Sequence, residues 1–145
     1  MNLEIEKRTC ECGTVEEGIF DKDTGQLLEG TATRREYIIE GKFDKDTNFL
    51  IEGKITCLFL GGQVYEGTFD KDTGLLIEGK KTYPSIGQVH EGKFGEGKSL
   101  EGKVTYISGN VAEGTFDKDT GRFVEGKVTF PNGKTAYVND YKEAA

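Results

Sequence analysis

Apolar side chains are scarce in this chain, and glycine takes many of the positions that they would otherwise fill. Hydrophobic residues make up 34% of the 145 residues, and 21 residues are glycine. We therefore expect no thick two-layer core. No apolar run approaches the roughly 18 residues that cross a bilayer, and Met1–Cys10 lacks the basic start and apolar centre of a signal peptide. These absences predict a soluble, cytoplasmic protein.

Cysteine and clusters of basic residues are equally few. The three cysteines are an odd number in a chain of this length, so we expect no disulfide framework and a reducing compartment. The formal net charge is −7, and Arg34 and Arg35 are the only adjacent arginines. Binding to nucleic acid or to an anionic membrane needs a basic patch. The composition thus opposes a nucleic-acid partner and argues against a membrane partner.

The chain repeats one short unit, whose clearest copy is Tyr65–Tyr83, YEGTFDKDTGLLIEGKKTY. A turn sequence of the type FDKDTG recurs along the chain, in full at Phe20, Phe69 and Phe116, as FDKDTN at Phe43, and shortened to FGEG at Phe94. Lys-x-Thr half-units alternate with it from Lys54, Lys80, Lys103 and Lys127. Every second Glu-Gly glycine, at positions 18, 41, 67, 92 and 114, follows the last by 23, 26, 25 and 22 residues. This period indicates a repeat array.

Each half-unit alternates apolar and polar residues over six to eight positions and is bounded by a turn, which is typical of a β-strand. The DKDTG sequence predicts a short hairpin loop in which the glycine has positive φ. Asn48 replaces that glycine in one copy, and asparagine tolerates the same conformation. We predict an all-β, single-layer antiparallel meander of about 11–12 strands, elongated, twisted and curled. Residues 1–145 form one domain, with an imperfect half-repeat at 1–14, repeats at 15–137 and a tail at 138–145.

The alternation assigns the two faces of this sheet. One face carries Ile77, Gly79, Lys81 and Tyr83 of the clearest copy. The residues equivalent to Ile77 in other copies are Ile51, Leu100 and Val124. The other face carries Leu76 together with Glu, Lys and Thr. We expect aromatic rings from neighbouring strands to lie over the glycines, and we expect the sheet to curl toward this glycine-rich, apolar face.

The unit YEGTF, a Gly-ended turn, Glu-Gly and then KKTYPSIG resembles the MORN repeat, which begins Tyr-x-Gly and ends at a Thr-Tyr-x-x-x-Gly turn. The resemblance covers about five units from Val15 to Tyr137. It implies an elongated, trough-shaped sheet without catalytic residues, a role as a scaffold that dimerises or holds protein partners, and lipid binding as a further property of the family.

The repeated Asp-Lys-Asp-Thr-Gly has an alternative interpretation as a Ca²⁺ loop, because two aspartates spaced by one residue begin such loops. The candidate ligands are the first and second aspartates of each copy: Asp21, Asp23, Asp44, Asp46, Asp70, Asp72, Asp117 and Asp119. An EF-hand loop needs glycine at its sixth position, whereas Gly25 and Gly74 are fifth. We favour a plain turn, with a Ca²⁺-stabilised structural or surface protein as the alternative.

Other catalytic or metal sites have weaker support. Cys10 and Cys57 take the position of Tyr83 in the repeat, so we expect both to pack in the core rather than bind metal with His90. His90 itself takes the position of Tyr65, which predicts a structural role. The Glu-Gly glutamates have similar surroundings, whereas acid–base pairs need unlike ones. We therefore expect no enzymatic activity and no cofactor.

Specificity is expected where the repeat is interrupted or where its apolar face is exposed. The turn Cys57–Gly62 carries apolar residues, which predicts either a loop that folds back over the sheet end or an interface. The candidate interface residues are Leu58, Phe59, Leu60, Tyr65, Phe69, Tyr83, His90, Phe94, Tyr106, Phe116 and Phe130. We predict a non-enzymatic scaffold or interaction module that binds a protein partner, or a second copy of itself, through this face or through its sheet edges, with a membrane-associated module as a second alternative.

Overall fold

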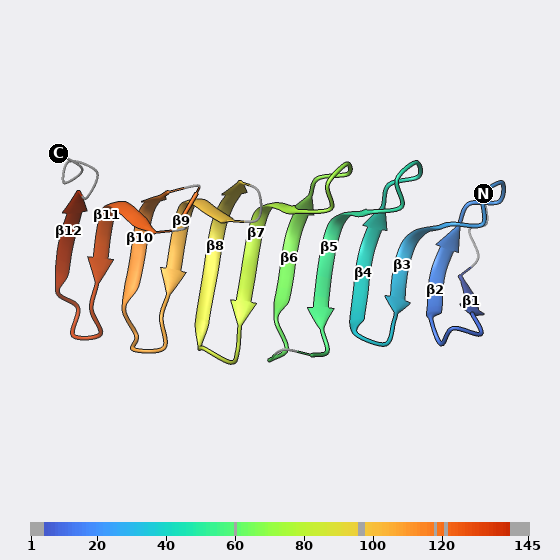
Figure 1. Ribbon diagram of the computed structural model, residues 1–145, viewed down its shortest axis with the longest axis horizontal. Helices are drawn as coiled ribbons and strands as arrows, with labels where there is room; N and C mark the ends of the chain where they lie inside the picture. Colours follow the sequence, from blue (N-terminus) through green and yellow to red (C-terminus); the bar gives the residue numbers. More distant parts are fainter. Residues whose placement is uncertain (1–4, 60, 96–97, 118, 121, 140–145) are drawn as a thin grey trace.

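The computed structural model describes residues 5–59, 61–95, 98–117, 119–120 and 122–139, and these segments contain strands and turns but no helix. Twelve strands form one antiparallel sheet, in which each strand pairs with the next along the chain (Figure 1). They are β1 (Glu6–Thr9), β2 (Val15–Phe20), β3 (Leu27–Thr33), β4 (Tyr37–Phe43), β5 (Leu50–Cys57), β6 (Val64–Phe69), β7 (Leu76–Tyr83), β8 (Gln88–Gly95), β9 (Lys98–Thr105), β10 (Val111–Phe116), β11 (Phe123–Thr129) and β12 (Thr135–Asn139). The predicted all-β meander is confirmed.

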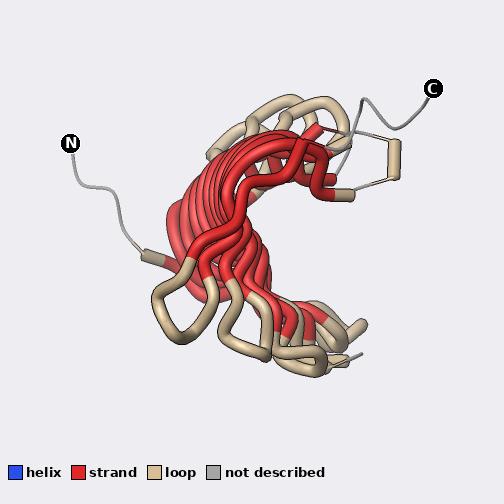
Figure 2. Tube along the Cα trace, turned by 90° about the vertical axis from the view of Figure 1, so that its left-hand side faces the viewer, coloured by secondary structure: helices blue, strands red, loops and turns tan. Residues whose placement is uncertain are grey.

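The sheet is long across its strands and strongly curved along them. Seen end-on, the strands follow a C, so the sheet forms a trough that runs the length of the molecule (Figure 2). Strands β1 and β12 lie at opposite ends and do not pair with each other (Figure 1). Pairing with β11 extends β12 to Asn139, into the predicted tail at 138–145; the remainder of that tail lies outside the described residues.

A row of glycines crosses the middle of the strands from β2 to β11, at the back of the C. They are in register with one another at Gly18, Gly30, Gly41, Gly53, Gly67, Gly79, Gly92, Gly102, Gly114 and Gly126. Their φ angles lie between 136° and 151°, a region that side chains of L-residues rarely allow. A Cβ at Gly67 would lie 2.0 Å from the carbonyl oxygen of Glu78 and 2.8 Å from the Cα of Gly79. Backbone, rather than the aromatic rings we expected, occupies the space beside each glycine.

A β-bulge beside each DKDTG-type turn changes the predicted assignment of faces. The register shifts just before Phe20, Phe43, Phe69, Phe94 and Phe116. Because two residues then oppose one, Phe69 pairs with Leu76 and the apolar Ile77 is the extra residue. Leu76 is 5% exposed and Ile77 is 45% exposed. The prediction that Ile77 faces the core and Leu76 faces solvent is therefore wrong, and in β5 Leu50 rather than Ile51 is the buried residue.

The core lies on the inner side of the trough, on both sides of the glycine row. Its buried apolar residues are Phe20, Leu27, Ala32, Leu50, Cys57, Phe69, Leu76, Phe94, Val104, Ala112 and Phe116. The central cluster contains Phe69 and Leu76, against which Ile55 and Tyr65 pack from beyond the glycine row. The curvature thus brings two rows of side chains together, and a single layer encloses its own core.

The loops form two series along the long sides of the trough. The DKDTG side holds the turns after β2, β4, β6, β8 and β10, and the opposite side holds the remaining turns (Figure 1). On the opposite side, successive loops cover each other: Ser85 lies against Gly61, Ile107 against Gly87 and Pro131 against Gly109. In the loop Cys57–Gly62, Phe59 packs edge-on against Tyr37, with 5.5 Å between ring centroids. This loop therefore folds back in part.

The cysteines fulfil one of two expectations. Cys57 is a buried free thiol in the core, as predicted, and burial raises its pKa. Cys10 is exposed and forms a disulfide with Cys12, so the prediction of core packing for Cys10 is wrong. The physical reason for its exposure is that β1 is an edge strand, with a neighbouring strand on one side only. Cys10 opens its turn with the same pair of backbone hydrogen bonds as Tyr106 and Phe130, but no further described strand lies beside β1 to cover its side chain.

Candidate functional site

The predicted interface residues fall into two groups that lie on different surfaces. On the inner face, Phe69, Phe94 and Phe116 are buried, and Tyr65, Tyr83, His90 and Tyr106 are half-buried. On the opposite loop side, Leu58 and Phe130 are exposed and Phe59 is half-buried. Leu60 lies outside the described residues. The trough is therefore one candidate site, and the apolar loops are another.

Two adjoining cavities open from the inner face between β4 and β7. The smaller, of about 280 Å³, is lined by Tyr37, Ile55, Tyr65, Phe69, Gly74, Leu75, Leu76 and Lys81. The larger, of about 550 Å³, is lined by Arg34, Tyr37, Ile39, Phe43, Thr47, Asn48, Phe49, Leu50, Ile55 and Gly74. Three residues, Tyr37, Ile55 and Gly74, line both cavities. We call this continuous hollow the central trough.

Two exposed apolar residues form the rim of the central trough on the DKDTG side. Phe49 and Leu75 are 42% and 43% exposed, and each follows the last residue of a DKDTG-type turn. A Cβ at Gly74 would lie 3.3 Å from the Phe49 ring, so one turn packs against the next. Sequence reasoning missed both residues, as well as Tyr37 and Ile55. The available signal was that the residue after the turn is apolar in both copies, although no loop needs an apolar residue there.

A buried lysine lies at one end of the smaller cavity. Lys81 is 8% exposed, and its Nζ lies 4.8 Å from the centroid of the Phe94 ring and 5.6 Å from that of Tyr65. Burial lowers the pKa of Lys81. Burial also lowers the pKa of His90, and the neighbouring charge of Lys81 lowers it further. Contacts between a cation and aromatic faces are favourable, so Lys81 fits this aromatic surrounding as part of the core.

The aspartates proposed as Ca²⁺ ligands have other partners in the structure. The Asp70 Oδ1 accepts hydrogen bonds from the backbone N–H of Asp72, at 2.7 Å, and of Thr73, at 3.0 Å. Equivalent bonds hold Asp21, Asp44 and Asp117. These bonds lower the pKa of each carboxyl group, the N–H of the threonine being the largest cause. The first aspartate of each copy thus caps its own turn.

The turn geometry agrees with the sequence in its other details. Gly25 and Gly74 have φ of 78°, and Asn48 has φ of 66°, so the predicted positive φ is confirmed at these positions. Lys45 forms an ion pair of 3.4 Å with Asp21 of the preceding turn. Within the described part of the chain, no group of three His, Cys, Asp or Glu residues is placed to hold a metal ion.

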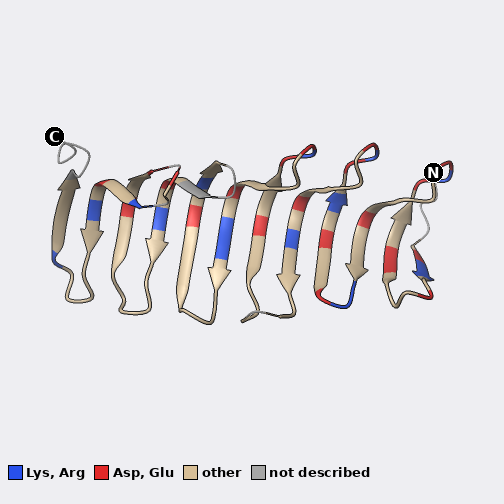
Figure 3. Cartoon of the chain, in the orientation of Figure 1, with Lys and Arg blue, Asp and Glu red and all other residues tan. Residues whose placement is uncertain are grey.

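Bands of basic and acidic residues recur along the strands of the sheet (Figure 3), and strand pairing arranges most of them in two rows, one on each side of the glycine row. One row alternates in sign from strand to strand, through Glu40, Lys54, Glu66, Lys80, Glu91, Lys103, Glu113 and Lys127. In the other row, glutamate alternates with lysine or threonine, through Glu29, Lys42, Glu52, Thr68, Glu78, Lys93, Glu101, Thr115 and Glu125. Opposite charges in neighbouring strands are favourable, and the outer face is consequently polar along its length.

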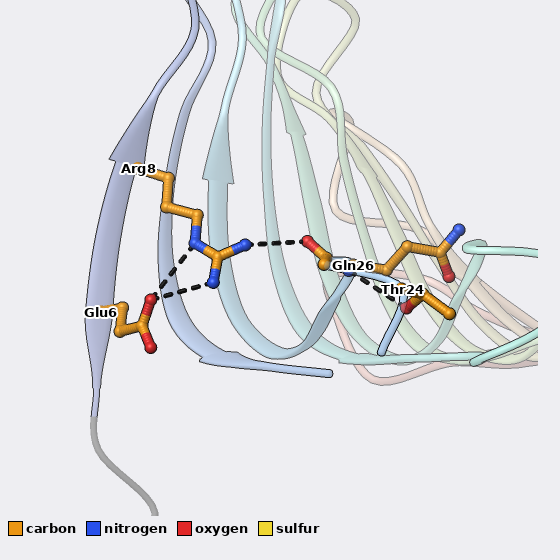
Figure 4. A network of polar contacts seen from close by, with 5 residues as sticks. Glu6, Arg8, Thr24 and Gln26 are labelled. Carbon is orange, nitrogen blue, oxygen red and sulfur yellow. Dashed lines mark hydrogen bonds and ion pairs between the residues drawn. The ribbon is translucent and has the colours of Figure 1, made fainter. Parts of the chain in front are cut away.

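At the N-terminal end of the trough, a side chain of the edge strand β1 lies over the core. Arg8 of β1 extends across the inner side to the first DKDTG turn, where it donates a 3.1 Å hydrogen bond to the carbonyl oxygen of Gly25 (Figure 4). Its guanidinium lies 3.9 Å from the centroid of the Phe20 ring and forms a 2.9 Å ion pair with Glu6. A hydrogen bond from the Gln26 N–H to Thr24 holds the same turn. Phe20 is thus shielded where the sheet ends.

The chain matches no protein-family model and no curated protein. Among the residues that the structure describes, none forms a helix of the length and apolar character needed to cross a membrane.

Proposed function

We propose that the chain is a non-enzymatic, MORN-like interaction module that binds an extended segment of a partner protein in the central trough. The observation that carries this proposal is a solvent-open apolar hollow, with cavities of about 280 and 550 Å³, in a sheet that no second layer of the described residues covers. Apolar pockets with a few polar groups are the usual form of a binding site.

The shape of the hollow supports a polypeptide as the occupant. The two cavities lie side by side along the trough, and their combined lining extends from Arg34, in the loop before β4, to Lys81 of β7. A chain lying in the trough would place one apolar side chain in each cavity, in the way that alternate side chains of an extended peptide enter separate pockets. The half-exposed Phe49 and Leu75 would then be covered at the rim.

The alternatives have less support. The first aspartate of each DKDTG turn already accepts two backbone hydrogen bonds, which favours a turn over a Ca²⁺ site. An anionic membrane would meet an acidic protein of net charge −7, whose outer face carries regular glutamates. For catalysis, an acid–base pair needs two carboxylates in unlike environments, whereas the described Glu-Gly glutamates are all exposed.

The proposal can be tested with a phage-displayed library of 12-residue peptides selected on the wild-type chain. Selected peptides should share alternating apolar residues. Leu75→Asp puts a charge at the rim of the trough, so we expect it to weaken their binding at least tenfold. Ile107→Asp is the matched control, because Ile107 is 80% exposed on the opposite loop side.

Two results would contradict the proposal. One is a set of selected peptides that bind Leu75→Asp as well as they bind the wild type. The other is a set that lose binding to Ile107→Asp, which would move the site to the loops. Thermal melts of both variants establish that they are folded before binding is compared.

A further inference from the structure

The glycines of the central row face one another in pairs, and this pairing determines which residue a neighbouring strand can carry at the row. In each pair, a Cβ on either glycine would lie 2.0–2.1 Å from a carbonyl oxygen of the other strand and 2.7–2.8 Å from the Cα of the facing glycine. The pairs are Gly18 with Gly30, Gly41 with Gly53, Gly67 with Gly79, Gly92 with Gly102, and Gly114 with Gly126. Each pair joins two strands connected through the DKDTG side.

Strands connected through the opposite side make a different contact at this row. Gly30 of β3 and Gly41 of β4 are in register, yet their Cβ positions meet β2 and β5, respectively, rather than each other. In a contact of this second type, a residue with a side chain can therefore face a glycine, provided that its strand is the last one in the sheet. A strand added on the far side would need glycine.

The two edge strands carry side chains at this row. Glu6 of β1 is in register with Gly18, and Val138 of β12 is in register with Gly126. Both contacts are of the opposite-side type, because β1–β2 and β11–β12 are connected there. Glu6 and Val138 thus occupy the positions that would face a strand added at either edge. Among the described residues other than glycine, Asn48 is the one with positive φ, so neither edge residue adopts the backbone conformation of the row.

A second copy of this chain could supply such a strand in the correct direction. Strand β12 of one copy and β1 of another would be antiparallel, since alternate strands of a meander run in opposite directions. This contact would be of the facing-pair type, so the two types of contact would continue to alternate along the row. It is head-to-tail and does not close on itself, so it would build a fibre. Unpaired edges are the usual route to this kind of association.

We propose that Glu6 and Val138 close the two sheet edges to a second copy. At a facing pair, the Cβ of either residue would lie within about 2 Å of a backbone oxygen, as at Gly114 and Gly126. The contact would also place the Glu6 carboxylate against Val138 and remove it from water, which is unfavourable. Glu6 is in addition held on its own strand by Arg8, at 2.9 Å. Two positions therefore decide whether the array stops or continues.

The test is the solution mass of paired substitutions, measured by light scattering over a range of concentrations. Glu6→Gly with Val138→Gly should form oligomers whose mass rises with concentration well above the 16.0 kDa of one chain. Glu6→Ala with Val138→Ala is the matched control: it removes the same carboxylate and the two valine methyl groups but keeps both Cβ atoms, and it should remain a monomer like the wild type.

A mixing experiment gives a second, independent test that does not depend on the double glycine variant being folded. Val138→Gly opens one edge and Glu6→Gly opens the other, so each variant alone should be monomeric. Their equimolar mixture should form a 1:1 pair of twice 16.0 kDa and grow no further. The proposal is overturned if the wild type itself forms head-to-tail oligomers, if the alanine pair associates as strongly as the glycine pair, or if the mixture of folded single variants stays monomeric.

Discussion

The two long sides of the trough are built from different kinds of loop. On the DKDTG side, one turn recurs with the same internal hydrogen bonds, in which an aspartate such as Asp70 binds two backbone N–H groups. On the opposite side, no two loops have the same sequence, and they expose Leu58, Ile86 and Ile107. The comparison teaches that the repeated residues of this chain fix its backbone, whereas the residues that vary between copies determine what its surface offers.

The glycine row separates the two sides, and changing it should have the largest effect. Gly67→Ala would place a Cβ 2.0 Å from the Glu78 carbonyl oxygen at a φ of 140°. We expect the free energy of unfolding to fall by about 3 kcal/mol or more, measured by urea titration. The control is Gly62→Ala on the opposite side, where a Cβ meets nothing within 4 Å and only the positive φ costs about 1–2 kcal/mol. Equal losses would refute the close approach of the strands.

The bulge beside the DKDTG turn predicts a large difference between two neighbouring residues. Leu76→Ala should lower the free energy of unfolding by about 2–5 kcal/mol, because it empties part of the core. Ile77→Ala should lower it by less than about 1 kcal/mol, since Ile77 is 45% exposed. Urea titrations of the two variants measure both losses in the free energy of unfolding. A larger loss for Ile77→Ala than for Leu76→Ala would mean that the faces alternate without a bulge.

Within the DKDTG turn, the two aspartates should differ. Asp70→Ala removes the acceptor of two backbone N–H groups, so it should lower the melting temperature by more than Asp72→Ala does. Asp72→Ala keeps the backbone N–H that residue 72 donates to Asp70. Asp70→Asn keeps an acceptor oxygen and should recover most of the loss. A larger effect at Asp72 would show that the second aspartate has a role that the turn does not explain.

The same carboxylates should make the free energy of unfolding depend on pH in the acid range. Backbone N–H donors lower the pKa of Asp21, Asp44, Asp70 and Asp117 below 3.8 in the folded chain. A lowered pKa contributes stability that is present above pH 3.8 and is lost as the pH falls through the folded value. Acid titration followed by circular dichroism should show this loss in the wild type and a shallower loss in Asp70→Asn. Identical profiles would mean that this carboxylate contributes nothing.

The opposite loops should tolerate change with the smallest effect on stability. Leu58 and Ile107 are 52% and 80% exposed, so aspartate at either position should alter the free energy of unfolding by no more than about 0.5 kcal/mol. Light scattering should give 16.0 kDa for the wild type and both variants. A wild-type dimer that these substitutions dissolve would instead place a self-association surface on this side.

Much of the fold follows from periodicity, and the parts that do not follow have local causes. The alternation of residues and the glycine spacing predict strands and register, because Gly67 and Gly79 hold equivalent positions in successive half-units. Alternation alone could not assign Leu76 and Ile77, since both are apolar and the bulge exchanges their faces. Cys10 holds the repeat position of Tyr106 and Phe130, and its exposure depends on β1 being an edge strand, which spacing within the repeat does not determine.

The candidate site was predictable only in outline. The inner face and residues such as Tyr65 and Phe69 follow from the alternation, but the cavities depend on how two rows of side chains meet across the curved sheet. Tyr37 and Ile55 line both cavities because the curvature brings them toward Gly74. This curvature arises from the backbone angles of the glycine row, and the pattern of apolar and polar positions does not specify those angles.

The most direct test of the central claim is methyl NMR of the folded chain during titration with a peptide selected from the library. Binding in the central trough predicts that the methyl resonances of Ile55 and Leu75 shift and saturate together with the peptide concentration. The resonances of Leu58, Ile86 and Ile107 should stay in place, because these side chains lie on the opposite loop side. Shifts confined to those three residues would contradict the account and assign binding to the loops.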